Sequence, residues 1–232
     1  MGVDWTALEE ALRVAALRHA ADVITGHPQH DFYAIALYGV STAESENIAM
    51  PVLALNSLQA LARDRALDSR DQLVERGEDL DEDDAESSWE QDEDDQEDDQ
   101  PDAPEDDLDA VLSELEQELE EDSESFYSDK WEPSEWHWSS IELCEDPAAQ
   151  IWSDAMTSLA AREGWEPTIK RYYRTMVNVA RAVREQLNSA TSADLVVYVA
   201  DEEHAERLLR LCLSEKQLAE HFPQLEALAE EH

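Results

Sequence analysis

The sequence Phe-Tyr-Ala-Ile-Ala-Leu-Tyr-Gly-Val, residues 32–40, is the strongest structural signal in the chain. It is apolar at both sets of alternating positions, so a strand formed here has two faces to bury. Its aromatic and β-branched residues favour a strand over a short buried helix, and Pro28 and the polar run 41–47 bound it. We therefore expect residues 32–40 to form a central strand of a sheet with helices on each side.

Three further strands are predicted. Residues 48–55 predict a second strand, which Pro51 places at a sheet edge or at a bulge, because proline cannot donate to a ladder. Residues 139–143 predict an edge strand, and residues 195–199 predict another buried strand. The chain is therefore expected to be α+β: a small, mostly antiparallel sheet of three to four strands flanked by helices.

Capping residues, prolines and glycines mark the expected helix ends. Asp4 or Thr6 caps the first helix, and Asn56 or Ser57 starts the second. The C-terminal part has four more predicted helix starts, at Asp146, Pro167, Asp201 and Ser214. The helix that Pro167 opens is the longest and carries an apolar stripe that we expect to face the core: Ile169, Tyr172, Tyr173, Met176, Val179, Val183 and Leu187.

Acidic residues are concentrated in the middle of the chain. The formal net charge is −42, and residues 77–125 hold 27 of the 58 Asp and Glu residues and no Lys or Arg. Such a segment cannot bury enough apolar area to offset the entropy of ordering it. We therefore expect 77–125 to be an acidic, largely disordered insertion, with an amphipathic helix at 107–121, and residues 1–76 and 126–232 to be the two parts of a single domain.

The charge also limits the classes of partner. At long range it disfavours nucleic acids and anionic membranes and favours basic proteins or cations. Cys144 and Cys212 fit no metal or redox spacing, which favours free thiols in a reducing compartment. The chain shows no signal-peptide pattern and no run of 18 apolar residues. We expect a cytoplasmic protein that holds no cofactor and binds a basic protein partner.

Two groups of apolar residues are candidates for binding that partner. Residues 130–138 contain three tryptophans; we expect Trp136 in the core, while Trp131 and Trp138 stay candidates for an exposed aromatic platform. The predicted helix 107–121 either packs loosely on the body or docks in a groove of the partner. Its stripe includes three candidate contact residues: Leu112, Leu115 and Leu119.

One helix face carries the only concentrated positive charge in the sequence: Lys170, Arg174, Arg181 and Arg184. It lies away from the apolar stripe of the same helix. Three interpretations are open. It is an ordinary solvated face, an intramolecular latch for the acidic segment, or a site for phosphate or nucleic acid. We favour the solvated face.

No motif for catalysis or metal binding is recognisable. His27 and His30 have an i, i+3 spacing but flank a proline, and we interpret them as an exposed pair that holds no metal. We therefore expect a protein that is not an enzyme. The alternative is a hydrolase or a nucleotide-handling enzyme with an unrecognised site around Tyr38, Glu135 and His137.

Several stretches resemble a bacterial family known as domain of unknown function 4303 (DUF4303). The likeness rests on residues 32–38, Asn56-Ser57 at a helix start, Trp131-Glu132-Pro133-Ser134-Glu135-Trp136, and residues 195–199 followed by Asp201. It covers both flanks but not residues 77–125. Ser57 stands where the family pattern has Thr, and Pro133-Ser134 reverses the family's Ser-Pro order. The resemblance implies the fold and no established activity.

Small acidic α+β proteins of similar character occur as immunity partners of secreted bacterial toxins, which is a fold-level analogy. We therefore hypothesise an acidic protein-binding protein, and an immunity protein that neutralises a basic toxin is its leading form. A further alternative is a nucleic-acid mimic, in which the acidic segment occupies a DNA-binding groove.

Overall fold

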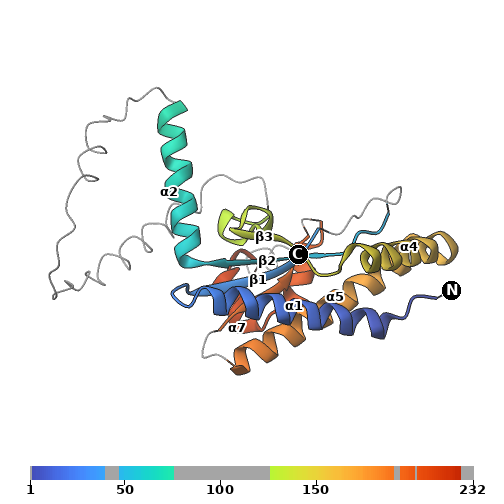
Figure 1. Cartoon of the computed structure of the whole chain (residues 1–232). Coiled ribbons are helices and arrows are strands. Elements are labelled where there is room, and N and C mark those ends of the chain that lie inside the picture. The colour runs from blue at the N-terminus through green and yellow to red at the C-terminus, as the bar shows by residue number, and fades with distance from the viewer. Residues whose placement is uncertain (1, 40–46, 76–125, 191–193, 202, 226–232) are drawn as a thin grey trace. The chain divides into compact units, whose positions relative to one another are not determined.

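The computed structural model describes residues 2–39, 47–75, 126–190, 194–201 and 203–225 (Figure 1). Met1–Asp64 and Ser125–His232 together make one compact unit, and Arg65–Glu124 make a second. The predicted helix 107–121, with Leu112, Leu115 and Leu119, lies outside the described residues, as does the insertion 77–125. The fold described below is that of the first unit.

The described strands form a four-stranded sheet in the order β3-β2-β1-β4. β1 (Phe32–Tyr38) pairs antiparallel with β2 (Val52–Ser57) and parallel with β4 (Val196–Val199). β2 also pairs antiparallel with β3 (Trp138–Glu142). The sheet is mixed but mostly antiparallel and is accompanied by helices, so the predicted α+β class and the central position of β1 are confirmed.

β2 is a central strand, so Pro51 marks neither of the two expected features: β2 is not at a sheet edge, and the register shift of β2 against β3 lies between Leu53 and Leu55 and not at Pro51. Pro51 lies one residue before the strand, where the ladder requires no donor. The edge belongs to β3, as predicted for residues 139–143. The register between β2 and β3 shifts between Leu53 and Leu55, and Ser140 of β3 has a positive φ of 58° at this bulge.

One face of the sheet is covered by a long helix, on which two further helices pack. α5 (Trp165–Ala190) lies on β1 and β4, and α1 (Trp5–Gly26) and α4 (Asp146–Glu163) pack on α5 (Figure 1). Asp4 caps α1, because its carboxylate accepts a hydrogen bond from the Ala7 backbone N–H at 3.1 Å. The apolar stripe predicted for α5 is confirmed, since all seven of its residues are at most 8 % exposed.

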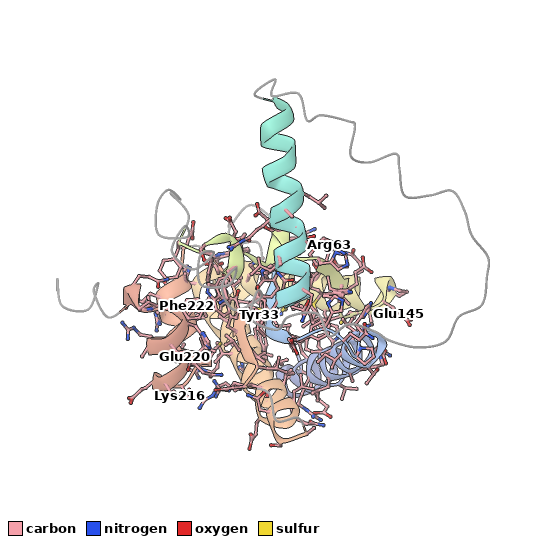
Figure 2. All side chains as sticks on the ribbon, turned by 90° about the vertical axis from the view of Figure 1, so that its left-hand side faces the viewer. Tyr33, Arg63, Glu145, Lys216, Glu220 and Phe222 are labelled. Atoms are coloured by element: carbon pink, nitrogen blue, oxygen red, sulfur yellow. The ribbon has the colours of Figure 1, made fainter. Side chains whose placement is uncertain are left out.

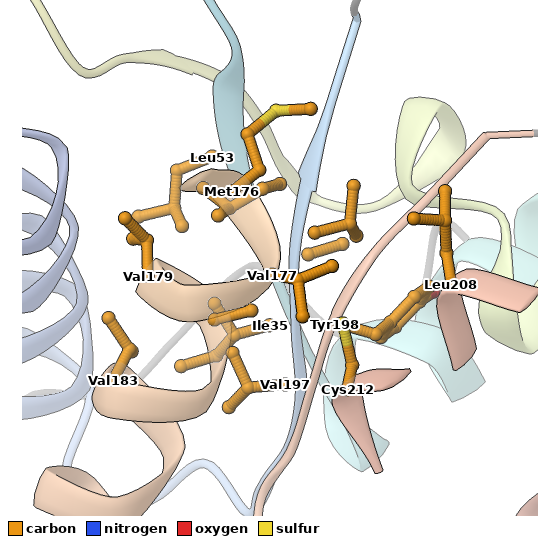
Figure 3. Packing of buried hydrophobic residues seen from close by; sticks show 14 of the residues in the cluster. Ile35, Leu53, Met176, Val177, Val179, Val183, Val197, Tyr198, Leu208 and Cys212 are labelled. Carbon is orange, nitrogen blue, oxygen red and sulfur yellow. The ribbon is translucent and has the colours of Figure 1, made fainter. Parts of the chain in front are cut away.

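The strands are covered by apolar side chains on both sides (Figure 3). On one side, residues of α5 lie beside residues of β1 and β4: Val179, Val183, Ile35 and Val197. On the other side, a β4 residue lies beside two residues of α6 (Ala205–Cys212): Tyr198, Leu208 and Cys212. β4 therefore buries both of its faces, as the sequence predicts.

The ends of the shorter helices follow the capping residues, with one correction. Ser57 caps α2 (Leu58–Glu75) by accepting a hydrogen bond from the Ala60 N–H at 3.1 Å. Ser214, a predicted helix start, caps α7 (Glu215–His221) through a capping box with Gln217. Asp201, however, does not begin a helix directly. Its carboxylate accepts from the His204 backbone N–H at 2.9 Å in a turn, and α6 begins only after that turn.

Candidate functional site

Trp138, the first residue of β3, has four other rings around it. Its ring centroid lies 4.5 Å from that of His137, 4.9 Å from His27, 5.0 Å from Phe32 and 5.3 Å from His30. These distances are those of favourable aromatic pairs. We call these five residues the Trp138 patch.

The turn after α1 brings two of the histidines to this place. His27 follows the last residue of α1, and its Nδ1 lies 2.9 Å from the Val23 carbonyl oxygen, to which it donates. The His30 N–H donates to the His27 carbonyl oxygen at 3.1 Å and closes the turn around Pro28. β1 then begins at Phe32. The pair that the sequence presents as an isolated loop feature is thus part of a larger cluster.

The beginning of α2 makes two polar contacts with the patch. Ser57 Oγ lies 2.8 Å from Nδ1 of His30, and Nη2 of Arg63 lies 2.6 Å from Nδ1 of His137. Figure 2 shows Arg63 on α2. A guanidinium group only donates, so Nδ1 of His137 accepts and the ring is neutral with its proton on Nε2.

The environment of His137 favours this neutral form. Partial desolvation of the exposed ring lowers its pKa, and the positive charge of Arg63 lowers the pKa further, whereas Asp64 acts in the opposite direction. His30 and His27 also lower the pKa of His137. The described patch therefore presents aromatic rings and the neutral imidazole of His137 beside one guanidinium group.

The Trp138 patch can be reached from solvent. Trp138 and His30 are half-buried, whereas His27 and His137 are exposed. Aromatic rings with hydrogen-bonding edges are enriched at protein–protein interfaces, where they combine apolar area with directional polar contacts. Trp138, a candidate partner-binding residue of the sequence, thus lies at a surface that suits this role chemically.

Trp131 and Trp136 lie in the core instead, at 6 % and 3 % exposure. The Trp131 ring centroid lies 4.8 Å from that of Phe222 and 5.4 Å from that of His221, and the Tyr198 hydroxyl donates to the Trp131 carbonyl oxygen. The core position expected for Trp136 is confirmed. Trp131 does not form an exposed platform, because its ring packs against the C-terminal part of the chain.

The basic stripe of α5 has members in different environments: Lys170, Arg174 and Arg181 are exposed and Arg184 is half-buried. Lys170 Nζ lies 3.9 Å from a carboxylate oxygen of Glu166, a weak surface pair. Arg184 donates to the Cys212 carbonyl oxygen and to Oε1 of Gln217, the latter at 3.2 Å. Arg184 therefore ties α5 to the end of α6 and the beginning of α7, which is a structural role.

The residues of the enzyme hypothesis come from different elements of the first unit. Tyr38 is the last residue of β1, and its hydroxyl oxygen accepts from the Ser140 N–H at 3.1 Å. His137 lies just before the other end of β3, against Trp138. Glu135 is exposed in a short 3₁₀ helix, Pro133–Glu135.

A second cluster of titratable groups, which the sequence did not predict, surrounds Asp201. The Asp201 carboxylate accepts from the Tyr173 hydroxyl and lies 3.1 Å from Nδ1 of His204, and the rings of Tyr173 and His204 stack 5.6 Å apart. Burial, and then the hydrogen bond to Asp201, raise the pKa of Tyr173. The sequence offers one indication of this cluster, because Asp201 follows the buried strand β4 closely. The same position, however, is equally typical of a residue that caps a helix.

His204 borders a cavity of about 620 Å³ beside α6. An imidazole whose Nδ1 donates to a carboxylate offers Nε2 as a proton acceptor. Among the described residues, the charged side chains that line the cavity are two carboxylates and two guanidinium groups: Glu203, Glu206, Arg207 and Arg210. These four described charges balance one another.

Cys144 and Cys212 are free thiols. Burial raises the pKa of both, that of Cys212 to about 12, so both thiols are protonated at neutral pH. Within the described ranges, no three His, Cys, Asp or Glu side chains are grouped so that they could hold a metal ion. None of the helices in the described part of the chain has the length and apolar composition needed to cross a membrane.

Comparisons with known proteins give no match: no family model, no curated protein and no solved structure matches this chain. The resemblance to the DUF4303 family therefore stays a prediction.

Proposed function

We propose that this protein is a non-enzymatic protein-binding protein whose partner is basic. The observation that carries the proposal is the charge: 58 acidic residues against 16 Lys and Arg, with 27 of the acidic residues and none of the basic ones in residues 77–125. Such a field accelerates encounter with a cationic partner and repels anionic competitors.

The Trp138 patch supports the second step of such binding. Long-range charge mainly sets the association rate, whereas short-range contacts at buried aromatic residues set the lifetime of a complex. Trp138 is half-buried and has the exposed rings of His27 and His137 beside it. The biological form that we propose is an immunity protein that neutralises a cationic bacterial toxin, such as a nuclease.

The first test measures association with a basic probe protein, lysozyme, by stopped flow. Deleting residues 78–124 is expected to lower the association rate constant by about tenfold or more at low salt and to change it little at high salt, where charges are screened. The control has the full length, with every Asp and Glu of 78–124 replaced by Asn or Gln. It should behave as the deletion does, because charge and not length is responsible.

Circular dichroism of both variants verifies that the first compact unit still folds. An association rate that is independent of salt, or unchanged in both variants, would overturn the proposal. The immunity form has its own test: the chain is co-expressed with a cationic nuclease toxin domain, and cell growth is measured. Protection that Trp138→Ala weakens supports this form, and absence of protection by the intact chain removes it.

A further inference from the structure

Two histidines hold the first turns of α2, residues 58–64, to the sheet of the first compact unit. His30, just before β1, contacts Ser57, the residue that caps α2. His137, just before β3, contacts Arg63 in the second turn of α2. Both contacts use Nδ1 of the imidazole, so the protonation of one ring nitrogen decides whether each contact exists.

The contact with Ser57 identifies Nδ1 of His30 as an acceptor. Ser57 is fully buried, and its Oγ already accepts from the Ala60 N–H at 3.1 Å. A buried hydroxyl hydrogen needs an acceptor, and Nδ1 of His30 lies 2.8 Å away. We therefore assign the Ser57 hydroxyl as the donor to His30. His137 has the same tautomer, because Arg63 can only donate to it.

His27 has the opposite arrangement. Its Nδ1 lies 2.9 Å from the Val23 carbonyl oxygen, which only accepts, so Nδ1 of His27 carries a hydrogen. Protonation of His27 keeps this hydrogen bond. Protonation of His30 or His137 at Nδ1, in contrast, turns that nitrogen from an acceptor into a donor. The nitrogen then faces another donor, the Ser57 hydroxyl or the Arg63 guanidinium.

We propose that His30 and His137 form an acid-sensitive clasp, which holds the first turns of α2 when both rings are neutral and releases them when both are protonated. Release leaves the buried Ser57 hydroxyl without an acceptor, and it places the His137 charge against the Arg63 guanidinium. Losing one such hydrogen bond changes an equilibrium by about tenfold.

The other charged groups at this place do not cancel the effect. Asp64 accepts from Nη2 of Arg63 at 2.9 Å, and Asp31 is held by Gln59 through two hydrogen bonds of 2.8 and 2.9 Å. His27, from the end of α1, lies 5.6 Å from His30, ring centroid to ring centroid. Protonated rings so close to one another repel, which adds to the release in acid.

The direction of the pH dependence follows from His137. Its pKa in the folded protein lies below its ordinary value of 6.5, because burial and Arg63 disfavour the charged ring. The unfolded chain therefore binds more protons in this range, and the contact stabilises the fold fully above pH 6.5. This contribution is lost as the pH falls from 6.5 through the folded pKa.

The tautomers are tested on the unmodified full chain by ¹H–¹⁵N correlation spectra of the imidazole rings. At about pH 8, His30 and His137 are expected as Nε2–H tautomers and His27 as the Nδ1–H tautomer. An Nδ1–H tautomer at either His30 or His137 would overturn the proposal without the need for any variant.

Release is measured by amide hydrogen exchange of residues 60–64. After correction for the intrinsic exchange rate, protection is expected to fall by about tenfold or more between pH 8 and pH 5. In the double variant His30→Asn, His137→Asn the side-chain oxygen occupies the place of Nδ1 and does not titrate, so protection should change by less than about twofold.

His19→Asn on α1 is the matched control, since His19 also lies beside an arginine: its Nε2 is 3.1 Å from Nη2 of Arg18. This variant should keep the pH response of the unmodified protein. An unchanged response in the double Asn variant, or a response lost in His19→Asn, would show that acid acts elsewhere and not through the clasp.

Discussion

Buried tyrosine hydroxyls in this fold are of two kinds. Tyr198 is fully buried, and its hydroxyl donates to the Trp131 carbonyl oxygen. Tyr127 is 3 % exposed, and its hydroxyl donates to no acceptor within the described residues, although the Asp201 backbone lies close enough to oppose, through a weak hydrogen bond, the rise in pKa that burial causes. The two rings are neighbours, with centroids 6.0 Å apart. The substitution of Tyr by Phe thus removes a hydroxyl that donates a hydrogen bond at position 198 and a hydroxyl that donates none at position 127.

We expect Tyr198→Phe to lower the free energy of unfolding by about 1–3 kcal/mol, because the buried carbonyl of Trp131 loses its donor. Tyr127→Phe should change it by no more than about 0.5 kcal/mol, or raise it, because the cost of burying a hydroxyl hydrogen without an acceptor disappears. Urea unfolding followed by tryptophan fluorescence measures both. Equal destabilisation by the two variants would show that Tyr127 has a partner in solution.

At the scale of elements, the junction between α4 and α5 depends on one backbone conformation. Gly164 ends α4 with φ of 105°, and its N–H donates to the Ala160 carbonyl oxygen at 2.8 Å. α5 begins at the next residue. A glycine can turn the chain so sharply because it lacks a Cβ.

Gly164→Ala is expected to destabilise the protein by about 1–2 kcal/mol, through the strained φ. Its Cβ would also meet Cγ of Pro167 at 3.4 Å. Gly26→Ala is the control, because Gly26 is helical, has no atom within 4 Å of the added Cβ and should be neutral or slightly stabilising. Thermal unfolding compares the two, and a neutral Gly164→Ala would contradict this account of the junction.

Local patterns predicted the elements that are buried along a regular face. The stripe of α5 and the apolar run of β1 report burial through their own spacing, whatever covers them. The central position of β2 could not be predicted from Pro51, because it depends on pairing with β3, which lies far along the chain. The hydrophobic periodicity of a helix or strand shows that one of its faces is buried, but it does not show which other element covers that face.

The same limit applies to the candidate site. The spacing of His27 and His30 gives no indication of Trp138, which lies more than one hundred residues away in the sequence. Trp131 and Trp138 looked alike in sequence, yet the chain buries one in the core and leaves the other half-exposed at the edge strand. The Asp201 cluster was missed because a helix cap explains an aspartate equally well.

At the scale of the whole molecule, the net charge of −42 is a cost to every compact state. The flanks share in it: residues 1–76 have 11 acidic and 6 basic residues, and residues 126–232 have 20 and 10. The described ion pairs do not offset this, since most involve exposed side chains and exposed pairs contribute little.

We therefore expect salt to stabilise the protein. Raising NaCl from about 0.02 to about 0.3 M should increase the free energy of unfolding by roughly 1 kcal/mol or more, because the Debye length falls from roughly 20 Å to roughly 6 Å and the acidic side chains repel one another less. Urea midpoints measure the effect. The variant with Asn and Gln in place of the acidic residues of 78–124 should respond less, and an equal response would assign the repulsion to the flanks alone.

The sheet interleaves the two flanks. β1 and β2 come from the first flank and occupy its centre, while β3 and β4 come from the second and occupy opposite edges, each paired to a strand of the first. A nick of the backbone between residues 77 and 124 would thus cut no ladder between these strands. The resulting fragments would remain associated as a two-piece protein, whereas either fragment made alone would lack half of the sheet.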